Sequence, residues 1–169
     1  SSDYYKEKWW INGHLHREDG PAEIVKQGGV ITEERWYYKD KLYRKGGGPS
    51  STINDKYGRG YKTLVYTNRE GVYNRLDGPA VETKSLTDPN KKYKSNYYFI
   101  DGTRLTPKQY FEYLKRTGIE MPEPYYSEYL AQSEKMKKVS GAKKKKEEAP
   151  QEQPTEQPQG FTFNFGDLT

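Results

Sequence analysis

Short runs of large apolar and aromatic side chains alternate with glycine-containing turns along the first hundred residues. The opening example is WWINGHLHREDGPAEIV, which begins at Trp9. The step Asn12-Gly13 between large side chains predicts a tight hairpin, because both central residues of a type I′ turn need positive φ. A following Gly20-Pro21 predicts another turn, since proline restricts the residue before it. The pattern therefore predicts two short strands, Trp9–Ile11 and His14–Arg17, bounded by turns.

The same order of residues recurs further along the chain. Trp36–Arg44 matches Trp9–Arg17 position for position, Glu70–Ala80 is a third copy, and Tyr98–Gly102 is a truncated fourth. A period of about thirty residues predicts an array of repeats and not a single globular core. The turn residues that this alignment predicts are Asn12, Gly13, Gly20, Pro21, Gly48, Pro49, Gly71, Gly78, Pro79 and Gly102.

The phrase Trp-x-x-Asn-Gly-x-Leu-His-Arg-Glu-Asp-Gly-Pro-Ala, at residues 9–22, resembles the variant MORN (membrane occupation and recognition nexus) repeats of large DNA viruses, phages and bacteria. In later copies Asp40 replaces the turn glycine, and Tyr43 and Asn74 replace the histidine. The resemblance implies a mainly β fold, an elongated antiparallel β-meander over residues 1–104 that serves as a scaffold or binding surface. It implies no reaction, and it suggests a structural component of a virus or phage particle.

Residues 105–139 have the pattern of a helical cap on this array. Thr106-Pro107 followed by Gln109 is a capping box with proline at the first helical position. Apolar side chains then recur every three or four residues up to Leu114, and Gly118 is a suitable stop. We expect this helix to cover the last open edge of the sheet, because exposed strand edges invite association. A second helix is predicted at Tyr125–Val139.

The remaining residues have a different composition. Residues 140–160 are charged and rich in proline and glutamine, which predicts a disordered linker. The final segment, 161–169, reads FTFNFGDLT and places Phe161, Phe163 and Phe165 at period two. We predict that these phenylalanines, with Leu168 in a secondary role, bind a protein partner as a strand added to a sheet edge. Two alternatives stay open, in which the segment folds back on its own sheet or is an incidental hydrophobic terminus.

Composition supports a thin sheet in place of a deep core. Hydrophobic residues make up 31% of the chain, below the ~45–50% of ordinary domains, while there are 17 tyrosines whose ring contacts can stabilise a sheet. Cysteine is absent, which excludes disulfides and thiolate metal sites. We find no secretion signal and no apolar run long enough for a transmembrane segment. The expected location is therefore the cytoplasm or a virion, without membrane insertion.

Candidate chemistry is sparse, and we expect no enzyme activity, no cofactor and no metal. His14 and His16 share one face of a strand, but packing beside the turn explains them better than metal binding. The stretch Gly46–Ser51 lacks the lysine and helix of a phosphate-binding loop. Three arginines recur with the repeat, at Arg17, Arg44 and Arg75. We interpret them as a structural ladder with Asp19, Asp77 or neighbouring tyrosines in preference to an anion site, because recurrence follows the fold.

The main alternative function is nucleic-acid binding. The net charge is +5 and the isoelectric point about 9.1, and the basic excess lies in the tyrosine-rich array. Interleaved basic and aromatic side chains can neutralise phosphates and stack on bases. Arg59, Tyr61 and Lys62 are the candidate nucleic-acid-binding residues, because their stretch partly matches an RNA-binding strand motif.

Overall fold

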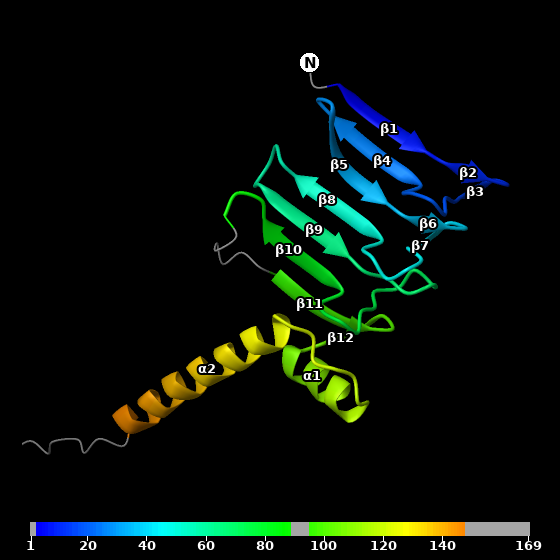
Figure 1. Cartoon of the computed structure of the whole chain (residues 1–169). Helices are drawn as coiled ribbons and strands as arrows, with labels where there is room; N and C mark the ends of the chain where they lie inside the picture. Colours follow the sequence, from blue (N-terminus) through cyan, green and yellow to red (C-terminus); the bar gives the residue numbers. More distant parts are fainter. Residues whose placement is uncertain (1–2, 89–94, 148–169) are drawn as a thin grey trace, which may run out of the picture. The chain divides into compact units, whose positions relative to one another are not determined.

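The computed structural model describes residues 3–88 and 95–147 of the chain. It is mainly β, and eight antiparallel strands form one sheet in which each strand lies beside the strands that precede and follow it along the chain (Figure 1). The strands of this sheet are β1 (Tyr4–Lys8), β4 (Glu23–Gln27), β5 (Val30–Arg35), β8 (Ser51–Asp55), β9 (Tyr61–Val65), β10 (Val81–Ser85), β11 (Ser95–Ile100) and β12 (Thr103–Leu105). This antiparallel meander confirms the predicted fold class.

Small hairpins extend from one end of the large strands. β2 (Trp10–Ile11) pairs with β3 (His14–Leu15), and β6 (Tyr37–Tyr38) pairs with β7 (Lys41–Leu42). A bridge between Thr67 and Tyr73 closes a third hairpin. We call residues 9–17, 36–44 and 66–75 hairpins 1, 2 and 3, and residues 98–105, which join β11 to β12, hairpin 4. Figure 1 shows hairpins 1 and 2 on the same side of the sheet.

The turns of these hairpins have the geometry expected from the sequence. Asn12 and Gly13 have φ of 49° and 76°, which confirms the predicted turn of hairpin 1. In hairpin 2 the corresponding residues, Lys39 and Asp40, also adopt positive φ, at 46° and 66°. Asp40 tolerates this conformation better than most non-glycine residues, because aspartate can hydrogen-bond locally.

The main apolar core lies at the C-terminal end of the sheet. Helix α1 (Pro107–Arg116) contacts β11 and β12, and the Tyr98, Tyr110, Phe111 and Leu114 side chains are buried together. The capping box at Thr106 is present as predicted: its hydroxyl accepts from the Gln109 amide at 3.2 Å. Elsewhere most residues of strands β5, β8 and β9 are only half-buried, as a thin sheet requires.

Helix α2 (Tyr125–Glu147) is longer than the sequence pattern predicted. We predicted that it would end at Val139 and that a linker would begin at residue 140. Residues 140–147 are instead helical, because lysine, alanine and glutamate favour the helix even without a face to bury. The chain divides into two units at Leu130, and residues 131–147 belong to the second unit. None of the described helices is long and apolar enough to cross a membrane.

Candidate binding face on the hairpins

An arginine lies over an aromatic ring at the base of each of the first three hairpins. The guanidinium carbon and the ring centroid are 3.7 to 4.2 Å apart, which is close for a cation–π contact. The pairs are Arg17 on Trp9, Arg44 on Trp36 and Arg75 on Tyr66. In the first and third pairs the arginine Nε also donates to an aspartate two residues on, at 3.0 and 2.9 Å. The contacts with Asp19, Asp77 and Tyr66 match the predicted structural ladder, whereas the stacking of two arginines on tryptophans was not predicted.

A Cβ at the glycine of each Gly-Pro turn would come within 3 Å of this arginine's guanidinium carbon, and at Gly78 also of the Tyr125 ring. A Cβ on Gly20 would lie 2.7 Å from the Arg17 guanidinium carbon, and a Cβ on Gly48 would lie 2.9 Å from that of Arg44. Neither glycine adopts positive φ, whereas Gly78 has φ of 152°. At Gly78, unlike at Gly20 and Gly48, the backbone conformation therefore adds to the steric restriction.

In hairpin 4 the arginine position is Thr106, and an aromatic side chain from helix α1 takes over the stacking. Tyr110 lies 4.5 Å from Tyr98, ring centroid to centroid, where an arginine would be expected. Its hydroxyl accepts a hydrogen bond from the Gly78 amide at 3.1 Å and lies 3.0 Å from the Gly78 carbonyl oxygen. Burial raises the pKa of Tyr110 to about 12. The helix thus completes the ladder as well as covering the last strands.

Hydrogen bonds join hairpin 1 directly to hairpin 2. The Asp40 amide donates to the Leu15 carbonyl at 2.9 Å, and the Asp40 carboxylate accepts from the Leu15 amide at 2.7 Å. His14 donates to the same carboxylate at 2.5 Å and lowers the pKa of Asp40. The buried His16 accepts from the Lys39 amide at 3.1 Å. Both histidines therefore hydrogen-bond to hairpin 2. His16 is buried, in line with the packing interpretation, whereas the His14 side chain is exposed.

Hairpins 2, 3 and 4 continue this row. The Thr67 hydroxyl donates to the Leu42 carbonyl, which links hairpin 3 to hairpin 2. The Gly102 amide donates to the Tyr73 carbonyl at 2.8 Å, and the Asp101 amide donates to the Asn74 side chain at 2.9 Å. Asn74 thus makes the same kind of contact as His16, although the residue types differ. The hairpins form a second, narrower row along the end of the large sheet.

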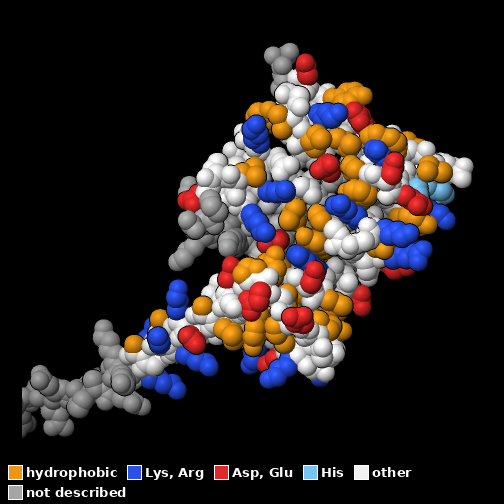
Figure 2. Space-filling view, in the orientation of Figure 1, with side chains coloured by type: hydrophobic (Ala, Val, Ile, Leu, Met, Phe, Trp, Pro, Cys, Tyr) orange, Lys and Arg blue, Asp and Glu red, His pale blue; other side chains and the backbone are white. Residues whose placement is uncertain are grey.

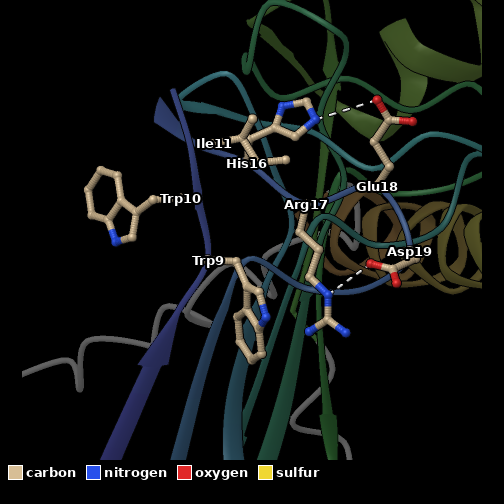
Figure 3. Close-up of a pocket in the computed structure, with 7 residues that line it drawn as sticks. All are labelled: Trp9, Trp10, Ile11, His16, Arg17, Glu18 and Asp19. Atoms are coloured by element: carbon tan, nitrogen blue, oxygen red, sulfur yellow. Dashed lines mark hydrogen bonds and ion pairs between the residues drawn. The ribbon is translucent and has the colours of Figure 1, made fainter. Parts of the chain in front are cut away.

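A hollow of about 470 Å³ lies at the base of hairpin 1 (Figure 3). Its walls carry both aromatic and charged side chains, from Trp9, Trp10, Ile11, His16, Arg17, Glu18 and Asp19. Trp10 and Ile11 remain 58% and 52% exposed, which is high for side chains of this size. His16 pairs with Glu18 at 3.4 Å, and hydrogen bonding to Arg17 lowers the pKa of Asp19. Figure 2 shows histidine at this edge with hydrophobic and charged side chains beside it.

A second hollow, of about 220 Å³, occupies the matching place at hairpin 2. It is lined by Arg17, Glu18, Trp36, Tyr38, Tyr43, Lys45 and Arg69. Four of these side chains stand at the positions of first-hollow residues when the turns are aligned: Trp36 for Trp9, Tyr38 for Ile11, Tyr43 for His16, and Lys45 for Glu18. The two hollows are therefore the same structural feature with different side chains, and they share Arg17 and Glu18.

The residues predicted to bind nucleic acid lie elsewhere. Arg59 is in the β8–β9 turn, and Tyr61 begins β9 at the end away from the hairpins. Tyr61 and Lys62 are consecutive in this strand, so their side chains point to opposite faces of the sheet. Basic and acidic side chains are interspersed on the face shown in Figure 2. The three residues do not form one basic and aromatic surface.

The other predicted sites can now be placed. The predicted partner-binding residues Phe161, Phe163, Phe165 and Leu168 lie outside the described residues. Within residues 3–88 and 95–147, no group of three potential metal ligands comes together. The hollow residues Trp10, Tyr38 and Lys45 were not predicted from the sequence. Adjacent tryptophans at a strand start were the available signal, since neighbouring side chains point to opposite faces: Trp9 is half-buried and Trp10 is exposed.

Comparison with known proteins adds no family to this description. No protein-family model matches the chain, and no curated protein and no solved structure is significantly similar to it. The resemblance to MORN repeats accordingly rests on the residues that carry it, and it stays a hypothesis about this chain.

Proposed function

We propose that this chain is a non-enzymatic, MORN-like repeat module that binds an extended segment of a protein partner along hairpins 1 and 2. The observation that carries the proposal is the recurrence of one hollow, with an aromatic wall, at matching positions of two adjacent hairpins. Repeat arrays commonly bind partners in this way, since each unit presents the same surface to successive residues of the ligand.

The side chains at this face are of the kind that dominates protein interfaces. Tryptophan, tyrosine and arginine are enriched among the residues that contribute most to binding. Trp10 and Ile11 expose more than half of their surface. Removing this remaining surface from water would contribute roughly 1 kcal/mol or more per side chain before ordering costs. A partner that covers them therefore gains affinity from apolar contact alone.

The proposal keeps the C-terminal segment as a second anchor. Its basis is the period-two pattern of Phe161, Phe163 and Phe165, with Leu168 in a secondary role, and it is independent of the hairpin face. A structural role in a virus or phage particle follows from the resemblance alone. We include it as the setting in which such a binding module would serve assembly.

The test compares partner capture by four forms of the chain. Extracts of the source cells are passed over the full chain, the Trp10→Ser/Ile11→Ser variant, a Leu86→Ser control, and a chain ending at Gly141. Leu86 is 44% exposed and follows β10 at the strand end away from the hairpins. The captured partner is then purified, and its affinity for each form is measured.

We expect the double variant to bind the partner at least about tenfold more weakly, which corresponds to roughly 1.4 kcal/mol, and the Leu86 control to bind normally. Equal affinity for the wild-type chain and the double variant would show that the hairpin face is not the binding surface. The shortened chain reports separately on the phenylalanine anchor, which is needed only if that chain loses the partner.

A further inference from the structure

The two hollows differ in charge although they occupy matching positions in the repeat. Three cationic side chains, Arg17, Lys45 and Arg69, line the second hollow, against one carboxylate, from Glu18. Within the described residues, no carboxylate lies within ion-pair distance of Lys45 or Arg69. Glu70, next to Arg69, is paired with Lys41 at 2.6 Å. Arg17 is itself paired with Asp19, and Glu70 lies close enough to Arg69 to interact electrostatically without forming an ion pair. Among the residues that the structure describes, the cations of the second hollow that have no ion-pair partner are therefore Lys45 and Arg69.

Aromatic rings frame this charge. The Arg69 guanidinium carbon lies 5.8 Å from the Tyr38 ring centroid, and Tyr43 meets Tyr38 edge to face with centroids 6.5 Å apart. A carboxylate entering here would contact the Lys45 and Arg69 cations. The neighbouring rings would exclude part of the surrounding water, and charge-assisted hydrogen bonds are strong in such a site. At about 220 Å³ the hollow has room for one side chain of a ligand.

The first hollow has the opposite preference. Glu18 and Asp19 line it, and its one guanidinium, from Arg17, is already bonded to Asp19 and to the Pro21 carbonyl. Trp10 and Ile11 supply exposed apolar surface beside these acids. An acidic group would be repelled here, whereas an apolar side chain would be covered.

The spacing between the hollows sets the spacing of the ligand groups. Two strands of the large sheet separate each hairpin from the next. Because neighbouring strands are about 4.8 Å apart, corresponding positions of adjacent hairpins lie roughly 10 Å apart. A peptide in the extended polyproline II conformation advances about 3.1 Å per residue with three residues per turn, so side chains three residues apart point to the same side. Two such side chains lie about 9 Å apart and therefore span neighbouring hollows.

We propose that hairpins 1 and 2 bind an extended acidic peptide, with an apolar side chain in the first hollow and an aspartate or glutamate carboxylate, three residues away, between Lys45 and Arg69 in the second. This inference rests on the proposed function and specifies the chemistry of the partner. A nucleic-acid strand fits the same face less well. It carries a phosphate at every nucleotide, and its next phosphates would lie against Glu18 and Asp19.

The test is a selection of short random peptides, displayed on phage, against the full chain. Enriched peptides are synthesised, together with partners in which each acidic residue is replaced by its amide. Affinities are measured by fluorescence anisotropy for the wild-type chain, the Lys45→Glu/Arg69→Glu variant, the Trp10→Ser/Ile11→Ser variant and a Lys56→Glu/Lys108→Glu control. The control makes the same change in charge at two exposed lysines outside the hairpins. Labelled single-stranded DNA is measured in parallel.

We expect enriched peptides to share an acidic and an apolar residue three positions apart. Affinity should fall at least about tenfold with the amide peptide and with the Lys45/Arg69 variant, and should be unchanged in the control. A consensus that needs Trp10 and Ile11 but contains no acid would overturn this inference and leave the proposed function standing. If no peptide depends on either variant, both are wrong. Tighter binding of DNA than of any peptide, lost in the Lys45/Arg69 variant, would assign the cations to phosphate instead.

Discussion

Replacing Gly48 by alanine tests whether the Gly-Pro turns exist to let an arginine stack on its ring. The new Cβ would lie 2.9 Å from the Arg44 guanidinium carbon, which sits 4.2 Å from the Trp36 ring centroid. Gly48 does not have positive φ, so the backbone itself accepts alanine. The guanidinium is the end of a flexible side chain and can move away, so the loss is its contact with the ring.

The magnitude follows from two opposing effects. Loss of the cation–π contact costs about 1 kcal/mol, whereas alanine restricts the unfolded chain and stabilises by about 0.4–1 kcal/mol. Gly48→Ala alone should therefore change the free energy of unfolding by less than about 1 kcal/mol. In an Arg44→Ala background the contact is already absent, and the same substitution should stabilise the protein. The coupling between the two substitutions should be about 1 kcal/mol.

Urea unfolding of the four proteins in this double-mutant cycle measures the coupling. Gly46→Ala is the matched control, because Gly46 has φ of 95° with no atom near its would-be Cβ. It should cost about 1 kcal/mol in both backgrounds, from backbone strain alone. If Gly48→Ala has the same effect with and without Arg44, close approach to the arginine is not the reason for this glycine.

Four further predictions address contacts of the hairpins and of helix α1. Tyr110→Phe should lower the free energy of unfolding by roughly 1–3 kcal/mol, because the Gly78 amide loses its partner, and a urea titration measures this. Burial raises the pKa of Tyr110 and of Tyr125 to about 12. The contribution of these neutral hydroxyls to stability is therefore complete below about pH 10 and is lost as the pH rises towards about 12. The Tyr110→Phe variant should accordingly lose less stability at alkaline pH than the wild-type chain. The hydrogen bond from His14 lowers the pKa of Asp40. This carboxylate therefore stabilises the fold above about pH 4, and its contribution disappears on further acidification. In Asp40→Asn the free energy of unfolding should fall less steeply below about pH 4 than in the wild-type chain. Thr106→Ala should cost about 1 kcal/mol through loss of the helix cap, and an unchanged melting temperature would contradict the role of the capping box.

Features that depend on neighbouring residues were predictable from the sequence. The turn at Asn12-Gly13 and the start of α1 at Pro107 are specified within a few residues, and both appear as expected. Helix α2 runs past its predicted end, because that end was placed where the periodic pattern of apolar side chains stops. Residues 131–147 need no buried stripe to be helical.

The candidate binding face could not be predicted in the same way. The second hollow brings Arg17, Lys45 and Arg69 together from three successive hairpins, and which hairpins are adjacent is a matter of strand pairing. The reason for Gly20 and Gly48 was also missed, because the sequence does not show that an arginine packs against them. Local signals gave the elements, while the contacts between elements decide where a ligand can bind.

The order of strands in the sheet makes the length of this molecule adjustable. Each strand pairs with the strands next to it in the chain, so inserting or deleting one complete stretch, with its two strands and its hairpin, leaves all other pairings and their registers in place. Within the array, helix α1 contacts β11 and β12 and bonds through the Tyr110 hydroxyl to Arg75 and Gly78, all near the last hairpins, so the terminal cap would fit an array of any length. Duplication within the gene could thus lengthen the binding face by one hollow at a time, and the charge at positions such as Glu18 and Lys45 could then diverge to match a longer ligand.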